Sequence, residues 1–516
     1  MVYEDVGPSK TSTRCCEKRK SKILSRTLGK NLLPLDGKHK RLVHIAAALV
    51  GHRIPVWYHK QTKEIYCEVD PPKNIDNYTQ DDDVLDTWAS SWIWAHAIFR
   101  TDKERKYYYP TSILVTAPDI IFFWVARMIM SGMHFMKDIP FSHVYFTSVI
   151  RDLQGRKMSK SLGNSPDPLD VIKEYGADAL RFTVLYLAPL GQDVLFSADR
   201  CDFGRNFANK IWNAGRFLLM NAEKIKIDDK LKDSHIDFAD EWIISRFNET
   251  LAEFNNAMDS FEINNATKII YSFVWNDFCD WYVEMIKNRL YSESIDATPE
   301  LNMEVKSAVL TRALSIFENM LKMVHPFMPF VTEEIWQLTK ERKDGESIST
   351  SEFPEVKKKL INPQADTEME TVVDIVTAIR NIRGEMNIPP SKKITVLLKS
   401  SEVSERQIDY IKKLTRVEDL KAGESITKLK ASASSVVKSS EIYIPLEGLI
   451  DLDVERQRLQ KEITRLEGSL SGIEKKLSNQ KFVSGAPAEV VDKERTKQRD
   501  WQENLRKLKE ILENLN

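Results

Sequence analysis

The segment KMSKS, Lys157 to Ser161, places two ammonium groups three residues apart on a short polar stretch. An apolar run before it, Val144 to Ile150, predicts a buried strand, and a helix is predicted to begin at Asp167 and end near Gly176. Two cations on a loop between a strand and a helix suit a phosphate group. Gly163 and Asn164 permit the backbone angles of a flap that closes over a triphosphate. The alternative for the same residues is a solvated basic turn.

The longer string VIRDLQGRKMSKSLGN resembles the KMSKS signature of class I aminoacyl-tRNA synthetases. In that family an amino-acid carboxylate attacks the α-phosphorus of ATP, and an aminoacyl adenylate and pyrophosphate form. The resemblance implies that Lys157 and Lys160 are catalytic, because ammonium groups at that place stabilise the charge that builds on the leaving pyrophosphate. The ATP-binding residues that it implies are Lys157, Met158, Ser159, Lys160 and Ser161.

Two kinds of residue in this loop have roles other than catalysis. Met158 is predicted to anchor the loop by packing, since an unbranched thioether fills irregular apolar gaps. Ser159 and Ser161 either donate hydrogen bonds to phosphate oxygens or cap the backbone of their own loop.

Three further segments resemble the valyl-tRNA synthetase family and differ from its leucyl and isoleucyl relatives: GHRIPVWYH (51–59), DVLDTWASSWIW (83–94) and DIIFFWVARM (119–128). The far C-terminus, NQKFVSGAPAEVVDKER, resembles the terminal coiled coil of the same family. The resemblance runs from about residue 51 to the end. It implies ATP-dependent activation of valine to valyl-AMP and transfer to tRNA-Val.

The resemblance also implies a valine pocket, with a carboxylate for the substrate ammonium and with indole and aliphatic walls for the isopropyl group. The residues that it implies are Trp88, Asp119, Ile120 and Trp124. Without the resemblance, Ile120, Trp124 and Met128 read as a core stripe at i, i+4 and i+8 on a helix. The chain has Ala89 where the family usually has Phe, and Ala117-Pro118 replaces the more usual small-aromatic pair.

The first fifty residues have poor periodicity and do not resemble this family. Synonymous codons chosen in one register and read one base later spell WFMKMSDLA and continue into a peptide that looks like the family stretch before GHRIPVWY. We therefore expect residues 1 to about 51 to be an out-of-frame translation. The chain is expected to be the C-terminal part of such an enzyme, without the histidine-containing HIGH motif and without the inserted editing domain.

Composition indicates an intracellular, largely helical protein of several domains. Its 516 residues carry a net charge of −1 with 29% charged side chains, so a nucleic-acid partner needs local basic patches. The five cysteines form no CxxC pair, which argues against a metal site or a disulfide framework. No signal peptide and no apolar run long enough to span a membrane is expected. We predict a cytoplasmic monomer that uses ATP with Mg²⁺ and holds no protein-bound metal.

The predicted fold is a multidomain α/β plus all-α protein. Helical periodicity over residues 200–343 predicts an α-bundle, which the resemblance implies is the anticodon-binding domain. In it, HPFMPFVTEEIW predicts an elbow at Pro326 and Pro329 before a helix capped by Thr332, with His325 as a structural hydrogen-bonding residue. The domains predicted are 1–51 (out of frame), 52–199 (C-terminal part of a Rossmann-like catalytic domain), 200–343, 344–448 (mixed linker region) and 449–516.

In the mixed region, KKITVLLKS and SEIYIPLEG predict strands, and KLKASASSVVKSS between them predicts a flexible solvated loop. The last segment has an a/d seam, and the break at 484–487 predicts an antiparallel helical coiled coil. The seam residues are Leu452, Leu459, Ile463, Leu466, Leu470, Ile473 and Leu477, with Trp501, Leu505, Leu508, Leu512 and Leu515 on the return helix. Its many lysines and arginines are either a solvated face or, as the resemblance implies, a grip on the tRNA elbow.

Three classes of function remain open from the sequence. The first is a valine–tRNA ligase, the second is a tRNA-binding fragment without catalysis, and the third is an inert fragment or scaffold. For this chain alone we expect no valine-dependent exchange of ATP with pyrophosphate, but residual affinity for tRNA.

Overall fold

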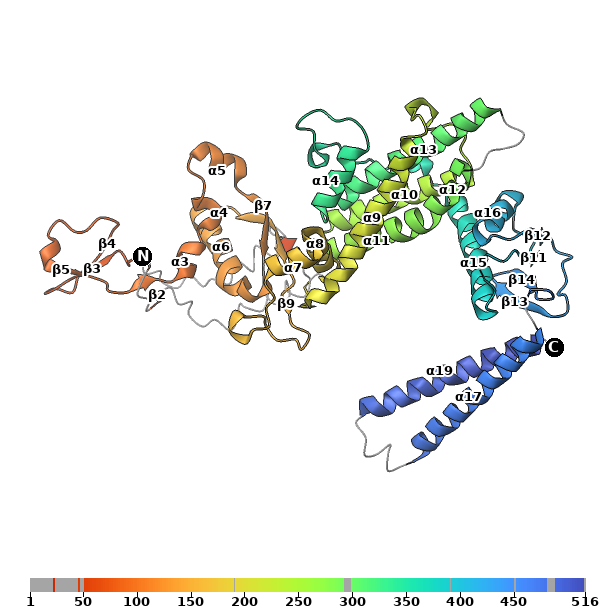
Figure 1. The fold of residues 1–516 in the computed structure, drawn as a ribbon. Coiled ribbons are helices and arrows are strands. Elements are labelled where there is room, and N and C mark those ends of the chain that lie inside the picture. Colours follow the sequence, from red (N-terminus) through yellow and green to blue (C-terminus); the bar gives the residue numbers. More distant parts are fainter. Residues whose placement is uncertain are drawn as a thin grey trace. The chain divides into compact units, whose positions relative to one another are not determined.

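The computed structural model describes residues 51–189, 191–291, 298–389, 391–449, 452–479 and 488–514, and the backbone of 22–23 and 45–46 (Figure 1). The interpretation of residues 1–51 as out of frame therefore lies almost wholly outside the described residues. The chain forms two compact units. Unit 1 comprises residues 1–212, 252–272 and 320–353, and unit 2 comprises 213–251, 273–319 and 354–516.

Unit 1 contains a parallel sheet in the order β1-β8-β7. Its strands are β1 (Lys22–Ile23), β8 (Phe141–Phe146) and β7 (Thr111–Thr116). The strand predicted over 144–150 is thus misplaced: β8 begins at Phe141 and ends at Phe146. The ladder stops there because its partner β7 ends before Pro118, which has no N–H to extend it. Ile150 belongs instead to β9 (Ile150–Arg151), which pairs in parallel with β10 (Val194–Leu195).

The crossover from β7 to β8 is helical over Pro118–Met136, with α6 (Ala126–Ser131) between two π-helical turns. Its residues Val125, Met128 and Ile129 are buried in a cluster with Phe141, Val144 and Phe146 of β8. Among the described residues, this one segment is long and apolar enough to cross a membrane by length and composition. The expectation that no such run exists is therefore wrong. The run is hard to recognise in the sequence because Arg127, which is itself buried, interrupts the series of apolar residues.

Unit 1 also contains shorter elements. Two small antiparallel sheets have the orders β4-β3-β5 and β2-β6. The strands are β2 (Ile45–Ala46), β3 (Val56–His59), β4 (Ile65–Cys67), β5 (Tyr78–Gln80) and β6 (Val84–Leu85). The helices are α3 (Thr87–Ser91), α4 (Trp94–Ala97) and α5 (Asp102–Tyr108).

The helix predicted after the loop is confirmed as α7 (Pro168–Tyr175). The Asp167 side chain accepts a hydrogen bond from the Leu169 N–H at 2.8 Å, and Gly176 ends the helix with a φ of +96°. Helix α8 (Ala177–Leu187) follows directly.

The predicted helical region contains α9 to α14. Their bounds are α9 (Cys201–Ala222), α10 (Phe238–Asp259), α11 (Ile263–Ser272), α12 (Val283–Tyr291), α13 (Pro299–Val324) and α14 (Pro329–Leu338), with a π-helical stretch over Phe273–Tyr282. The division between the two units passes through α9, α10 and α13.

The start of α14 corrects one prediction. Thr332 does not cap this helix: its hydroxyl donates to the Met328 carbonyl at 2.7 Å and bonds to His325 Nδ1 at 2.8 Å. The cap is Asp178 of α8, whose carboxylate accepts from the N–H groups of Phe330 (3.2 Å) and Val331 (2.7 Å). A carboxylate some 150 residues away therefore replaces the local cap. His325 is a structural hydrogen-bonding residue, as predicted.

Unit 2 contains a second, four-stranded sheet in the order β12-β11-β14-β13. Its elements are α15 (Pro363–Glu385), β11 (Thr395–Lys399), α16 (Glu405–Thr415), β12 (Asp419–Ala422), β13 (Ser432–Val437) and β14 (Ser440–Pro445). The strands predicted from KKITVLLKS and SEIYIPLEG are confirmed as β11 and β14. The flexible loop predicted between them is wrong, because 432–437 is the strand β13. Small residues hid it: Ser432 and Ala433 are buried and pair with β14.

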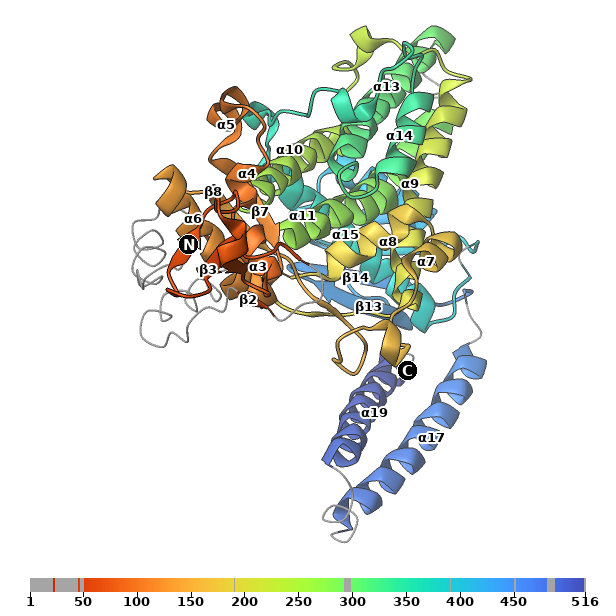
Figure 2. The same cartoon turned by 90° about the vertical axis from the view of Figure 1, so that its left-hand side faces the viewer.

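The C-terminal segment forms α17 (Leu452–Ser478) and α19 (Ala488–Asn514), which lie side by side (Figure 2). Ion pairs join Lys476 to Glu494 and Lys509 to Glu467, so the two helices run antiparallel as predicted. Leu459, Ile463 and Ile473 of the predicted seam are buried. The break at 484–487 and the side chains of Leu452 and Leu515 lie outside the described residues.

Candidate functional site

The segment that precedes the two lysines is a tight turn organised around one carboxylate. The Asp152 N–H donates to the Arg156 carbonyl at 3.1 Å, and Gly155 takes a φ of +78° inside the turn. The Asp152 carboxylate accepts from the backbone N–H groups of Gln154 (3.1 Å) and Arg156 (2.8 Å). It also accepts from Arg156 Nε at 2.7 Å. One side chain therefore fixes the backbone directly before Lys157.

Asn164 fixes the far end of the loop to the same carboxylate. Its Nδ2 donates to Asp152 Oδ2 at 2.9 Å and to the Lys157 carbonyl at 3.3 Å. Its Oδ1 accepts from the Ser159 N–H at 2.9 Å. The amide thus bonds to three points of the chain and closes residues 152–164 into a ring of hydrogen bonds.

These contacts hold the Asp152 carboxyl in its charged form. The hydrogen bond from Asn164, with those from Arg156 and its guanidinium charge, lowers the pKa of Asp152 to about 2 against the opposing effect of desolvation. The carboxylate is therefore ionised throughout the physiological range. Its charge is compensated within the loop by Arg156.

The two candidate catalytic lysines lie on this closed loop. Lys157 is exposed, and its backbone forms an isolated antiparallel bridge with Arg151. Lys160 begins a 3₁₀ turn, Lys160–Leu162, and its side chain lies outside what the structure describes. Gly163 takes a φ of +64°, in the left-handed region that favours glycine. The Lys157 side chain is therefore exposed to solvent on a backbone that hydrogen bonds hold in place. The catalytic roles of both lysines stay predictions.

The neighbours of the lysines anchor the loop. Met158 packs against a buried cluster of Val171, Val194, Phe196 and Cys201, which confirms the predicted packing role. The Ser159 hydroxyl accepts from the Leu162 N–H at 3.3 Å and bonds to the Ser161 hydroxyl at 3.2 Å. Ser159 thus caps the backbone of its own loop, while hydrogen bonds from either serine to phosphate stay a prediction.

The four residues predicted to bind valine lie on α3 and on the start of the crossover helix. The Trp88 ring stacks on Phe123 with centroids 5.9 Å apart, and Trp124 Nε1 donates to the Ser91 carbonyl at 3.1 Å. Ile120 is half-buried, and Asp119 is exposed in the first turn of the helix. Trp124 also packs against the buried cluster of α6 and β8, which contains Met128. Two of the three residues of the predicted core stripe therefore do contribute to packing. Ala89, the departure from the family pattern, is the buried residue of α3.

Within the residues that the structure describes, no group of three or more His, Cys, Asp or Glu side chains could hold a metal ion. Cys67 is exposed, and Cys201 and Cys279 are buried; none of these three described cysteines is in a disulfide.

Three family models match separate parts of the sequence. Residues 72–197 match the tRNA synthetases class I (I, L, M and V), and residues 240–398 match the anticodon-binding domain of tRNA ligase. Residues 451–516 match the valyl tRNA synthetase tRNA binding arm. The second match runs past the boundary predicted at 343, and the predicted domain boundaries stay predictions.

Curated relatives extend these matches over most of the chain. A valine–tRNA ligase from Chlorobaculum tepidum is 42% identical over 488 residues, which cover 90% of this chain and 53% of that protein. The valine–tRNA ligase of Bacillus subtilis is 42% identical over 460 residues, which cover 87% of this chain and 51% of that protein. The chain belongs to the valyl-tRNA synthetase family. It spans about half the length of the curated relatives it matches.

Membership of the valyl-tRNA synthetase family confirms the predicted fold class. Unit 1 holds the class I catalytic part with its parallel sheet, and the anticodon-binding model covers α10 to β11. Solved structures are less similar: a leucyl-tRNA synthetase complex with tRNA from Agrobacterium radiobacter K84 has a TM-score of 0.48 and 16% identity over 60% of this chain and 41% of that chain. That similarity is too low to support an inference.

Sequence reasoning missed Asp152 and the side-chain role of Asn164. The signal that could have found them is the Asp-x-x-Gly turn at 152–155, since Asp often bonds to nearby backbone N–H groups in turns. The sequence predicts only that Asn164 permits the backbone angles of a flap, whereas its side chain closes the loop by hydrogen bonds.

Proposed function

We propose that this chain carries the pyrophosphate side of the ATP site and the tRNA-binding parts of a valine–tRNA ligase. The observation that carries the proposal is the 42% identity to curated valine–tRNA ligases over 90% of the chain. The reaction proposed is attack of valine on the α-phosphorus of ATP, release of pyrophosphate, and transfer of the valyl group to tRNA-Val in the cytoplasm.

In this proposal Lys157 and Lys160 bind the β- and γ-phosphates. Their charge stabilises the departing pyrophosphate more than ground-state ATP, because negative charge develops there only as the bond to the α-phosphorus breaks. The ring of hydrogen bonds around Asn164 supports this role, since it keeps the loop backbone in place before ATP arrives. Mg²⁺ would enter with ATP as part of the substrate, with no protein-bound metal.

Trp88, Asp119, Ile120 and Trp124 form the proposed valine site. The exposed carboxylate of Asp119 suits the substrate ammonium, and the half-buried Trp88, Ile120 and Trp124 suit a small aliphatic side chain. A hydrophobic pocket alone separates valine from threonine by only about a hundredfold, a ratio that is a known property of this enzyme class. Pocket walls of this kind alone would therefore discriminate incompletely between valine and threonine.

A second function has support from one observation, that the chain spans about half of its relatives. Acting alone, it would bind tRNA without activating valine, through the anticodon-binding part and the arm of α17 and α19. We expect this behaviour for the isolated chain, as a monomer free of membranes.

ATP footprinting tests the ATP site without requiring turnover. Exposed lysines are acylated with and without MgATP, and modification is followed by mass spectrometry. MgATP should protect Lys157 and leave Lys173 of α7 unchanged, because both are exposed but only Lys157 lies on the loop. Equal modification of Lys157 with and without MgATP would contradict an ATP site at this loop.

A further inference from the structure

The proposed valine site is built from two segments that are separate in the chain. Trp88 lies on α3, whereas Asp119, Ile120 and Trp124 lie at the start of the crossover helix, residues 118–136. Helix α3 has only five residues, and a helix of that length is not stable by itself in water. Contacts with neighbouring elements must therefore hold Trp88 in place beside the crossover helix.

The middle and the C-terminal end of α3 contact the crossover helix through aromatic side chains. The Trp88 ring stacks on Phe123 with ring centroids 5.9 Å apart, and the Ser91 carbonyl accepts a hydrogen bond from Trp124 Nε1 at 3.1 Å. Trp88 and Trp124 are half-buried, and Phe123 is exposed. Contacts between partly exposed aromatic rings are individually weak. These two contacts do not fix the N-terminal end of α3, which is the end nearer to Trp88.

An ion pair joins that N-terminal end to the crossover helix. The Asp86 carboxylate lies 3.7 Å from the Nη1 atom of Arg127. Asp86 occupies the position at which an aspartate commonly caps a helix, yet within the described structure its side chain makes no capping hydrogen bond with α3. The charge of Asp86 therefore serves the contact with Arg127 and not the N–H groups of its own helix.

Arg127 is a charged side chain in apolar surroundings. Its side chain is 2% exposed, and its neighbours in the chain, Val125 and Met128, are buried in the cluster that packs on β8. A buried cation that loses its partner destabilises a protein strongly, whereas an apolar side chain in its place is tolerated. The Asp86 side chain is 24% exposed, so water can solvate its charge when Arg127 is replaced.

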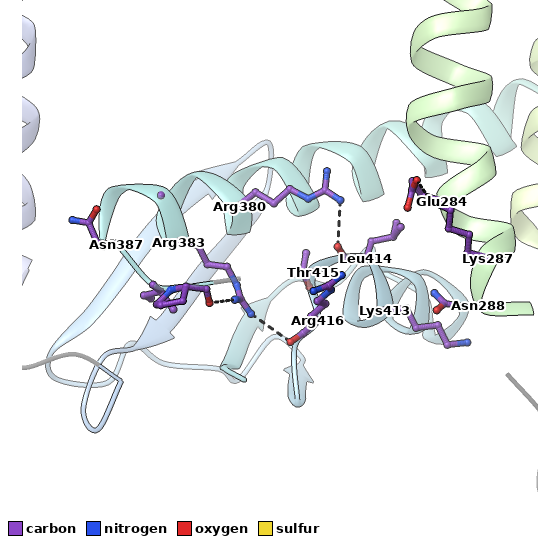
Figure 3. Close-up of a pocket in the computed structure, with 13 residues that line it drawn as sticks. Glu284, Lys287, Asn288, Arg380, Arg383, Asn387, Lys413, Leu414, Thr415 and Arg416 are labelled. Atoms are coloured by element: carbon purple, nitrogen blue, oxygen red, sulfur yellow. Dashed lines mark hydrogen bonds and ion pairs between the residues drawn. The ribbon is translucent and has the colours of Figure 1, made fainter. Parts of the chain in front are cut away.

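The charge that Arg127 faces distinguishes it from a second buried arginine, Arg383 of α15. Burial lowers the pKa of both guanidinium groups. Arg383 lies in a basic pocket of about 750 Å³ in unit 2 and donates to the carbonyls of Pro389 and Arg416 (Figure 3). The nearby charge of Arg416 lowers the pKa of Arg383 further, whereas the charge of Asp86 raises the pKa of Arg127. Arg127 is thus stabilised by an opposite charge from another element.

We propose that Arg127 and Asp86 are positioning residues of the valine site. Arg127 lies one turn after Trp124 on the crossover helix, and Asp86 lies two residues before Trp88. The ion pair therefore sets the distance between the two indole rings that form walls of the site. This rests on the proposed function in that the ligand between these walls is valine.

The test measures hydrogen exchange of indole N–H groups in the full chain by NMR. In Arg127→Met an apolar side chain of similar length replaces the guanidinium, so the core stays filled while the ion pair is lost. The Trp124 indole N–H should then exchange about tenfold faster, because its acceptor Ser91 lies on the released α3. The indole N–H of Trp336, which is buried in α14, is the reference and should exchange at an unchanged rate.

Two further variants separate positioning from a general loss of stability. Arg127→Lys keeps a positive charge at this place and should return the exchange rate of Trp124 to within about threefold of that in the unmodified chain. Arg53→Met removes an exposed ion pair with Asp82 and should change the rate at neither indole. Equal acceleration of both indoles in Arg127→Met, or acceleration of neither, overturns the proposal.

Titration with valine, followed by the same indole resonances, connects the ion pair to the ligand. Valine should shift the Trp88 and Trp124 resonances of the unmodified chain, with an affinity about tenfold weaker in Arg127→Met and within about twofold in Arg53→Met. Equal valine affinity of these two variants overturns the proposal. If valine shifts neither resonance in the unmodified chain, the proposed valine site fails, while the exchange rates still decide whether the ion pair positions α3.

Discussion

Asn164 donates from Nδ2 to Oδ2 of Asp152 over 2.9 Å, across twelve residues of chain. The loop that carries Lys157 and Lys160 is therefore closed by side chains that lie outside the KMSKS string itself. Because the Asn164 Oδ1 also accepts from the Ser159 N–H, one amide sets the backbone on both sides of Met158. Loop geometry and lysine chemistry are thus supplied by different residues.

Replacing Asn164 tests this division. In Asn164→Ala the Ser159 N–H loses its acceptor and the Asp152 carboxylate loses its strongest stabilising hydrogen bond. We expect hydrogen exchange at the Ser159 amide to speed up by about fivefold, since breaking one neutral hydrogen bond costs about 1 kcal/mol. Ser161→Ala, which removes only a contact between two hydroxyls, should change exchange at Ser159 by less than about twofold.

The pH dependence of the loop has a definite direction. The folded-state pKa of Asp152 lies below its ordinary value, so its contribution to stability is present above about pH 4 and is lost as pH falls toward about 2. In Asn164→Ala the folded-state pKa should rise toward its ordinary value, so that the loss is smaller and is complete at a higher pH. Carboxyl titration by NMR measures it, and an unchanged Asp152 pKa in the variant would contradict the hydrogen-bond assignment.

The cap that Asp178 provides to α14 should be measurable. Asp178→Ala leaves the Phe330 and Val331 N–H groups without their carboxylate. We expect the free energy of unfolding to fall by about 1 to 2 kcal/mol in urea titration. The control is Asp170→Ala, an exposed carboxylate in the first turn of α7, for which a change below about 0.5 kcal/mol is expected.

A close approach of α9 to α8 makes Gly204 irreplaceable. A Cβ at this position would lie 2.4 Å from the Ala179 carbonyl oxygen, a backbone atom that cannot move aside alone. Gly204→Ala should destabilise the chain by about 1 to 3 kcal/mol. Gly468→Ala in α17, where nothing lies within 4 Å of the added methyl, should instead be neutral or stabilise its helix by up to about 1 kcal/mol. Thermal unfolding of both variants distinguishes packing from helix propensity.

Asp366 of α15 gives the opposite pH behaviour to Asp152. Burial raises its pKa to about 6, although Ser245 donates to it at 3.0 Å. An acid with a raised folded-state pKa favours the fold at low pH, so stability should fall as pH rises from about 4 to 6 and then level off. Asp366→Asn should flatten this window and stabilise the chain by about 1 kcal/mol at pH 7. An unchanged pH profile in the variant would show that other carboxyls control it.

The parts of the fold that the sequence predicts well are those with strong periodicity or local caps. Helix α7 has both Asp167 and Gly176 at its ends, and the seam of α17 places Leu459 and Ile463 in the buried face. Strand β13 was missed because its buried side chains are Ser432 and Ala433, whose small size gives no apolar alternation. A solvated loop and a paired strand of small residues have similar amino-acid compositions.

In the candidate site, too, some residue roles can be predicted from the sequence and others cannot. The spacing of Lys157 and Lys160 could be read directly from the sequence, and so could the packing role of Met158. The role of Asn164 could not, because twelve residues separate it from Asp152 and no periodic pattern links them. Tertiary contacts of this kind also explain why Thr332 was taken for a cap that Asp178 provides.

We propose that this chain is a tRNA-binding part of a valine–tRNA ligase and carries the pyrophosphate side of an ATP site. The most direct test is the affinity of the full chain for tRNA-Val over a range of salt concentrations, with valine-dependent exchange of ATP and pyrophosphate measured in the same preparation. We predict salt-dependent binding that is tighter for tRNA-Val than for a DNA duplex of equal length, and no exchange by the chain alone. Affinity for tRNA-Val no greater than for the duplex would contradict the account.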